Sequence, residues 1–216
     1  DIDKRYNFFN PKLGLTYTFN SNNSVYASYA RANKEPNRND FESNAEAVQS
    51  ESLNDFELGW RHQGKRFSLN ANMYYMSYKN QLVLTGALDN VGEYLRENVD
   101  NSYRLGLELD VRVAISDQIA LNSNLALSQN KIKALTIDRD GRLQNLGTTN
   151  IALSPNVITT HAIEYAPNSQ FRAALIGKYV GETTKVSLQY SREKLKQLDS
   201  LVEDVWALSV SLYRGH

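Results

Sequence analysis

Three carboxylates are the side chains of this sequence best suited to acid–base chemistry: Glu57, Glu108 and Asp110. Each occupies a polar position in a segment where apolar and polar residues alternate. Two carboxylates placed close together can act as a general acid and a general base. Arginines occupy other polar positions of the same segments, at Arg61, Arg104 and Arg112. This mixture of charges favours a hydrated polar wall over a catalytic pair.

The other residue types offer little reactive chemistry. The sequence has three histidines, His62, His161 and His216, and no cysteine. The histidines are scattered and lack the spacing of metal ligands. Glycines occur singly within alternating segments, so no phosphate-binding loop is predicted. We therefore expect no bound metal, no cofactor and no enzymatic activity.

Four residues are candidates for ligand contact. Lys34, Arg38 and Asp40 lie in a long polar connection between residues 32 and 50, and Tyr78 follows a tyrosine-rich segment. Charged loop residues can bind a polar ligand, and a tyrosine ring can stack on one. The simpler interpretation is a solvated loop for the first three and an aromatic girdle or polar wall for the tyrosine.

A predicted hairpin between residues 52 and 85 would position three of these residues, Glu57, Arg61 and Tyr78. Its first arm places Phe56, Leu58 and Trp60 on one face, and its second arm continues this apolar face from Phe67 to Tyr75. Side chains of a strand alternate between two faces, so both arms predict strands with one apolar and one polar side. They exceed the usual ~5–6 residues of a globular strand and suit the ~9–11 residues of a membrane strand.

The same alternation predicts nine strands in all. Short turns are expected near 20–23, 62–66, 116–118 and 167–169, and long connections near 32–50, 86–101, 131–156 and 181–200. A helical pattern occurs only between Ser191 and Leu201. Short turns alternating with long loops along an antiparallel meander are typical of outer-membrane β-barrels. A soluble barrel that holds one ligand is the alternative fold.

Composition is compatible with this all-β fold class. The 24 basic and 24 acidic residues cancel, which argues against a nucleic-acid partner. No apolar run is long enough for a transmembrane helix. A mean hydropathy of −0.51 suggests a soluble protein. However, only alternate residues of a membrane β-strand contact lipid, so such a protein can also have a low mean hydropathy.

The strand count predicts an incomplete barrel. A complete single-chain bacterial barrel has an even number of strands, whereas nine are expected here, the first running from the loop end to the turn end. We therefore expect an open sheet of eight or nine strands. The strand that pairs with the first one, before Asn10, would come from sequence outside these 216 residues.

Several segments resemble the barrel of TonB-dependent outer-membrane receptors, particularly Bacteroidetes-like members. The resemblance covers roughly residues 8 to 182 and rests on 10–15, 25–31, 35–41, 51–59, 74–83 and 178–182. The stretch 183–201 matches poorly, and the chain ends on Leu212-Tyr213-Arg214-Gly215-His216 where such barrels usually end on an aromatic residue.

The resemblance implies the function and the partners. It implies a roughly 22-stranded barrel in the outer membrane of a Gram-negative bacterium, with residues 1–216 as its C-terminal portion. A plug domain and the segment that contacts the TonB complex would lie upstream of Asp1. The implied function is uptake of a scarce siderophore, vitamin, glycan or peptide. The alternative is a small self-contained barrel acting as an adhesin, an anchor or an enzyme.

Overall fold

The computed structural model describes residues 4–43, 48–88, 94–139, 142–189, 196–202 and 205–214. Their fold is almost entirely β-structure with one short helix, α1 (Arg38–Ser43). The strands are β1 (Lys12–Asn20), β2 (Asn23–Lys34), β3 (Glu51–Gln63), β4 (Phe67–Leu88), β5 (Tyr94–Ala114), β6 (Ile119–Lys133), β7 (Thr136–Arg139), β8 (Arg142–Asn145), β9 (Thr149–Asn150), β10 (Val157–Asn168), β11 (Phe171–Val180), β12 (Thr183–Gln189), β13 (Lys196–Val202) and β14 (Val205–Arg214).

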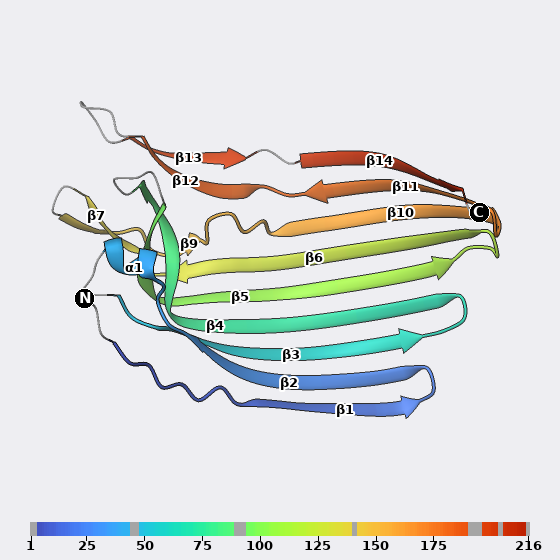
Figure 1. Ribbon diagram of the computed structural model, residues 1–216, viewed down its shortest axis with the longest axis horizontal. Coiled ribbons are helices and arrows are strands. Elements are labelled where there is room, and N and C mark those ends of the chain that lie inside the picture. The colour runs from blue at the N-terminus through green and yellow to red at the C-terminus, as the bar shows by residue number, and fades with distance from the viewer. Residues whose placement is uncertain are drawn as a thin grey trace.

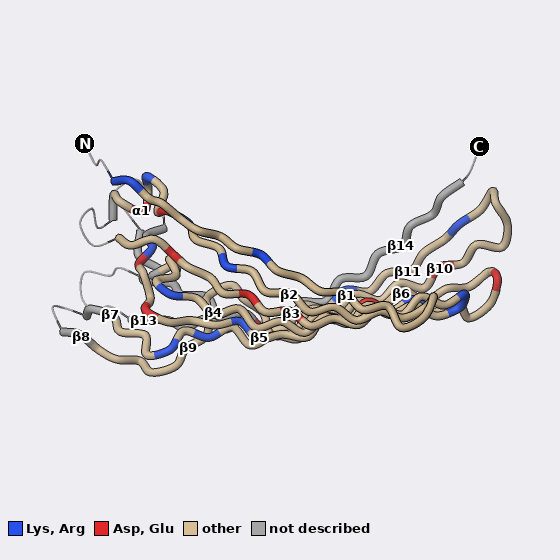
Figure 2. Tube along the Cα trace, turned by 90° about the horizontal axis from the view of Figure 1, so that it is seen from below, with Lys and Arg blue, Asp and Glu red and all other residues tan. Residues whose placement is uncertain are grey.

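Nine of these strands form one antiparallel meander in the order β1-β2-β3-β4-β5-β6-β10-β11-β14, and β9 adds a short pairing to β6 (Figure 1). Figure 2 shows the sheet from a second direction, in which the strands do not lie in one plane, so the sheet is curved. β1 and β14 lie at opposite ends of this order and do not pair with each other. The predicted all-β meander of nine strands and its open form are both confirmed.

The short turns gather at one end of the sheet and are built by local side-chain acceptors (Figure 1). Asn20 Oδ1 accepts the Asn22 amide at 3.0 Å. Ser116 Oγ accepts the amides of Gln118 and Ile119 at 3.2 and 3.1 Å. Asn and Ser favour turns because their short side chains bond to the backbone two or three residues on. The turn residues predicted from sequence therefore fix where these strands reverse.

Strand register keeps the apolar side chains on one face. Phe56 on β3 lies opposite Tyr75 on β4, which lies opposite Leu105 on β5. This face is the more open of the two, with Leu58 54% exposed and Met73 49% exposed. In water such a large apolar surface is unfavourable, so the fold requires an apolar environment against this face.

The long connections contain more regular structure than the sequence predicts. The connection expected at residues 86–101 is largely strand, because β4 extends to Leu88 and β5 begins at Tyr94. The connection expected at 181–200 contains β12 and most of β13, which pair antiparallel. Toward the loop end of the sheet, Val99 on β5 and Ile132 on β6 form a small buried cluster with Ile151. This cluster stabilises the strand extensions, and no periodicity within one segment could have revealed it.

The one helix of the described chain lies outside the segment whose sequence shows a helical pattern. The helical pattern between Ser191 and Leu201 falls partly on β13 and partly on residues outside the described part. The helix that forms is α1, where Asn37 Oδ1 accepts the Asp40 amide at 3.0 Å and Asp40 Oδ2 accepts the Asn37 amide at 2.8 Å. This reciprocal pair is a capping box. No helix in the described part of the chain is long and apolar enough to cross a membrane.

Candidate functional site: the polar wall and its loop end

The polar face of β3, β4, β5, β6 and β10 forms a continuous wall of hydrogen-bonding and charged side chains. Alternation along each strand and register between strands bring them together. The wall is made of Asp55, Glu57, Arg61, Asn70, Asn72, Tyr74, Tyr78, Arg104, Glu108, Asp110, Arg112, Asn122, Asn124, Asn130, Thr160 and Glu164. All three predicted carboxylates belong to it.

Each carboxylate of the wall has its own surroundings. Asn124 Nδ2 donates to Asp110 Oδ1 at 2.6 Å, and Ser28 Oγ donates to Glu57 Oε2 at 3.3 Å. Among the described residues no hydrogen bond joins any two of Glu57, Glu108 and Asp110 to each other. This arrangement fits the predicted hydrated wall rather than a catalytic pair.

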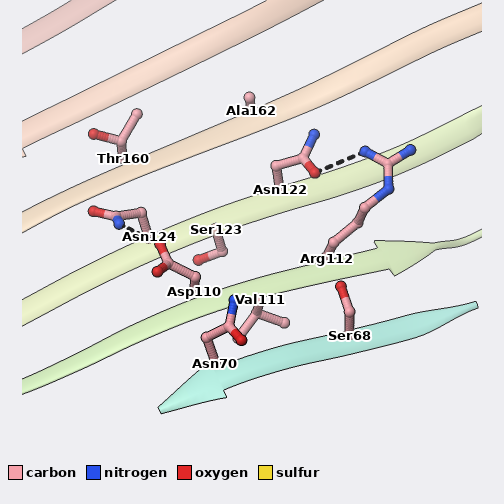
Figure 3. A pocket seen from close by; sticks show the side chains of 10 residues that line it. All are labelled: Ser68, Asn70, Asp110, Val111, Arg112, Asn122, Ser123, Asn124, Thr160 and Ala162. Atoms are coloured by element: carbon pink, nitrogen blue, oxygen red, sulfur yellow. Dashed lines mark hydrogen bonds between the residues drawn. The ribbon is translucent and has the colours of Figure 1, made fainter. Parts of the chain in front are cut away.

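Arg112 joins two strands of the wall through a partner that sequence reasoning did not name. Its Nη1 donates to Asn122 Oδ1 at 2.8 Å and lies 3.6 Å from Glu164 Oε2 on β10. Figure 3 shows this bond and the neighbouring Asn124–Asp110 bond around a shallow hollow of about 340 Å³. Small side chains at Ser68 and Ala162 leave the hollow open. Glu164 lies 52 residues from Arg112 in the sequence, so only the β6–β10 pairing brings the two together.

Two glycines of the wall make room for tyrosine rings. The ring of Tyr26 lies directly over Gly59, and the ring of Tyr74 lies over Gly106. The Arg61 guanidinium lies over the Tyr26 ring, 4.6 Å from its centroid. A glycine in a strand often marks the close approach of a neighbouring group. These contacts lay the two rings flat along the wall.

Tyr78 lies near Arg104, beyond the apolar band and toward the loop end. Arg104 Nη1 donates to Asn130 Oδ1 at 3.1 Å and to Ser154 Oγ at 3.2 Å. Burial raises the pKa of the Tyr78 hydroxyl above its usual value, partly offset by Arg104. The phenol therefore stays neutral and can donate a hydrogen bond. Sequence reasoning missed Asn130 and Ser154 because an Asn or Ser in a polar position carries no signal of its own.

The structure separates the three loop candidates into different environments. Lys34 Nζ lies 3.1 Å from Glu51 Oε1 at the end of the β2–β3 pair, with its side chain 60% exposed. Asp40 is 2% exposed and lies 3.7 Å from Arg96 on β5. Arg38 begins α1 and is exposed to solvent. Asp40 thus holds α1 against β5, while Lys34 and Arg38 reach solvent.

A second set of contacts connects the loop after α1 to the β4–β5 hairpin. Asn98 Oδ1 accepts the Gln49 amide at 2.8 Å, and Asn98 Nδ2 donates to the Gln49 carbonyl oxygen at 2.9 Å. Asn80 Nδ2 donates to Gln49 Oε1 at 2.8 Å. Asn80 has a φ of 54°, a left-handed conformation that asparagine tolerates better than most residues. The two long connections are therefore joined by hydrogen bonds into one unit.

In the described residues, no group of acidic or histidine side chains is arranged to hold a metal ion.

Three solved structures with a similar fold are named as an import receptor, a transporter and a siderophore receptor. The chain is similar to the ferric-catecholate import receptor Fiu from E. coli K12 (20% identity, TM-score 0.67, covering 95% of this chain and 28% of that one). It is also similar to the copper transporter OprC (12%, TM-score 0.71, covering 94% and 30%). The siderophore receptor PiuA from Acinetobacter baumannii matches at 17% identity and TM-score 0.66, covering 92% and 28%. No curated protein sequence matches the chain.

A family model gives the assignment. The chain spans less than a third of the length of these three structures, which agrees with the open edges of its sheet. The model described as "TonB dependent receptor-like, beta-barrel" matches residues 1–200. Receptor barrels of this kind lie in the outer membrane of Gram-negative bacteria, so the apolar face of the sheet contacts lipid and the polar wall faces the barrel interior. The chain belongs to the TonB-dependent receptor-like β-barrel family and forms part of such a barrel.

Proposed function

We propose that this chain is the later part of the barrel of a receptor that takes up a scarce ligand with energy from the TonB complex. The observation that carries the proposal is the open nine-stranded sheet, apolar on one face and polar on the other, with extended loops at one end. A wall of this kind encloses a polar passage only when further strands complete it. The relatives named above are transport receptors, which supports transport over catalysis.

We further propose a plug domain as the partner of the polar wall. Asp55 Oδ1 and Asn72 Oδ1 are buried oxygens without a hydrogen-bond donor in the described part of the chain. Buried acceptors normally have a partner, because leaving one unsatisfied costs about 1–3 kcal/mol. Glu108 lies on the same face and is exposed. A domain seated inside the barrel would reach the exposed Glu108, preferably with arginine or lysine side chains, and would have to displace neighbouring side chains to donate to the two buried oxygens.

Ligand contact is proposed for the loop end and the upper wall. The candidates are Lys34, whose ammonium pairs with Glu51, the exposed Arg38, and Tyr78, whose hydroxyl lies 3.6 Å from Met76 Sδ. Asp40, which is almost fully buried against Arg96, is assigned the different role of positioning α1. Siderophore, vitamin, glycan and peptide are the ligand classes to compare. A metal complex is tested first, because the relatives are named for ferric catecholate, copper and siderophore transport.

The proposal is tested by uptake measurements in cells that produce the intact receptor. Radiolabelled representatives of the four ligand classes are supplied with and without a functional TonB complex. We expect one class to accumulate only when both the receptor and TonB are present. Accumulation that is unchanged without TonB contradicts active transport.

The coding sequence ahead of Asp1 distinguishes the receptor from the small self-contained barrel. A domain of roughly a hundred residues encoded ahead of Asp1, with further strands, agrees with the receptor, since it supplies the missing part of a barrel that has an even strand number. A signal peptide immediately ahead of Asp1 contradicts it and favours an adhesin, anchor or enzyme.

A further inference from the structure

A group of cations lies on the lipid-facing side of the sheet, just beyond its outer band of aromatic rings. The band includes two ring pairs, Tyr29–Phe56 with centroids 4.9 Å apart and Tyr75–Tyr103 at 6.2 Å. Such aromatic girdles mark the level of the lipid headgroups. Farther toward the loops on the same face are the residues of what we call the outer basic patch: Arg31, Lys79, Lys131 and Lys133.

Strand register places the three lysines close together. Lys79 on β4 lies opposite Asn101 on β5, which lies opposite Lys133 on β6. Neighbouring strands are about 4.8 Å apart, so the backbones at Lys79 and Lys133 are about 10 Å apart. Lys131 lies on β6 two residues from Lys133, opposite Tyr103. Arg31 flanks this group on β2.

Two of the four patch residues have neutral partners. Lys131 Nζ donates to Asn150 Oδ1 at 2.6 Å, and Lys133 Nζ lies over the Tyr103 ring, 5.4 Å from its centroid. Within the described residues no carboxylate lies within ion-pair distance of Arg31, Lys79, Lys131 or Lys133. These contacts fix the direction of two lysines and leave their positive charge in place.

Two other cations at the loop end have carboxylate partners. Lys34 pairs with Glu51, and Arg96 pairs with Asp40, both away from the lipid-facing side. At the opposite end of the sheet, Arg66 lies 3.5 Å from Asp117. The chain as a whole carries equal numbers of acidic and basic residues. The four cations of the outer basic patch lack such a partner among the described residues, so they add positive charge to the lipid-facing side at this level.

We propose that the outer basic patch binds the phosphate groups of a lipid headgroup in the outer leaflet. Ammonium groups are point donors that suit phosphate oxygens, and Asn101 supplies a further amide donor between two of them. Lysines at a membrane surface also extend toward water without binding any particular lipid. Preference for phosphate over an uncharged headgroup distinguishes the two cases.

The test measures lipid binding by the intact detergent-solubilised receptor, using lipid A with its phosphates and the same lipid after dephosphorylation. Each lysine near an anionic lipid surface contributes about a fivefold gain in affinity. We expect Lys79→Gln, Lys131→Gln and Lys133→Gln together to weaken binding of phosphorylated lipid A roughly 100-fold. Binding of the dephosphorylated lipid should be weak for both proteins.

A matched control changes charge at the other membrane level. Lys65→Gln with Arg66→Gln removes two exposed cations beside a short turn and should leave lipid A binding unchanged. Heat-modifiable migration of each variant on a gel verifies folding. Equal binding of the two lipid forms by the wild type, or unchanged binding by the folded triple variant, overturns the proposal. So does a triple variant that loses affinity for soluble inorganic phosphate while its lipid binding is unchanged.

Discussion

The Tyr26 ring on β2 lies flat over Gly59 on β3, and a methyl group at Gly59 would overlap this ring. The contact connects two neighbouring strands on the polar face, and the Arg61 guanidinium lies over the same ring, 4.6 Å from its centroid. The same arrangement recurs two strands away, where Tyr74 covers Gly106. Each glycine is thus required by a tyrosine on the neighbouring strand, not by its own backbone conformation.

Gly59→Ala is expected to destabilise the barrel by about 1–3 kcal/mol, because the added methyl displaces the Tyr26 ring in a packed site. Gly177→Ala is the matched control, since nothing lies within 4 Å of a Cβ placed at that strand glycine. The measurement is urea unfolding of the intact receptor in lipid vesicles. Equal effects of the two substitutions would show that loss of glycine itself, and not the ring contact, sets the stability.

On the lipid-facing side, His161, Ser123 and Thr159 form a hydrogen-bonded polar cluster, which lies nearer the turn end than the outer aromatic band. The Thr159 hydroxyl donates to the Asn124 carbonyl oxygen at 2.7 Å, so His161 Nε2 donates to Thr159 at 2.9 Å. His161 Nδ1 then accepts from the Ser123 hydroxyl at 2.8 Å. This network explains why the faces of β10 alternate poorly in sequence.

Ser123→Ala is expected to destabilise the barrel by about 1–3 kcal/mol, since it leaves a ring nitrogen without its donor in an apolar environment. His161→Leu should cost little, because it removes the polar ring and its need for partners together. The double variant should resemble His161→Leu alone. A double-mutant cycle in the same unfolding assay measures this coupling, and additive effects of the two substitutions would rule out the network.

Asp40→Asn is expected to loosen the loop end without unfolding the sheet. The substitution removes the charge that pairs with Arg96 and weakens the cap of α1. Limited proteolysis of the intact receptor should show faster cleavage near residues 37–50, while the temperature of heat modification stays unchanged. Arg66→Gln breaks an exposed pair at the turn end and should leave this cleavage unchanged. If Asp40→Asn gives the same protease pattern as the wild type, Asp40 does not position α1.

Leu109→Arg tests the orientation of the sheet in the membrane. Leu109 lies opposite Ala71 and Leu125 on the apolar face, and arginine near the bilayer midplane costs roughly 2–4 kcal/mol. Asn70→Arg, on the polar face beside Ala71, should change stability by less than about 1 kcal/mol because it faces the hydrated interior. A larger loss for Asn70→Arg than for Leu109→Arg in a vesicle-folding assay would invert the assignment of the two faces.

The sequence by itself determined the membrane strands, their faces and the short turns. These features depend on side chains that alternate with a period of two and on Asn or Ser acceptors two or three residues away, so one segment contains all the information. The same reasoning predicted the polar wall, including Glu57, Glu108 and Asp110, because strand alternation alone decides which face a residue occupies.

Only the tertiary structure decided the partners. Arg112 lies beside Glu164 rather than a carboxylate of its own hairpin, and Asp40 lies buried against Arg96 rather than exposed to a ligand. The extensions of β4 and β5 were missed because they pack on Val99, Ile132 and Ile151 from three separate segments. The helix α1 was missed because its Asp40 is held by Arg96, far away in the sequence. A contact across strands depends on register and on the packing of residues far apart in the chain. Neither is encoded in the periodicity of any single segment.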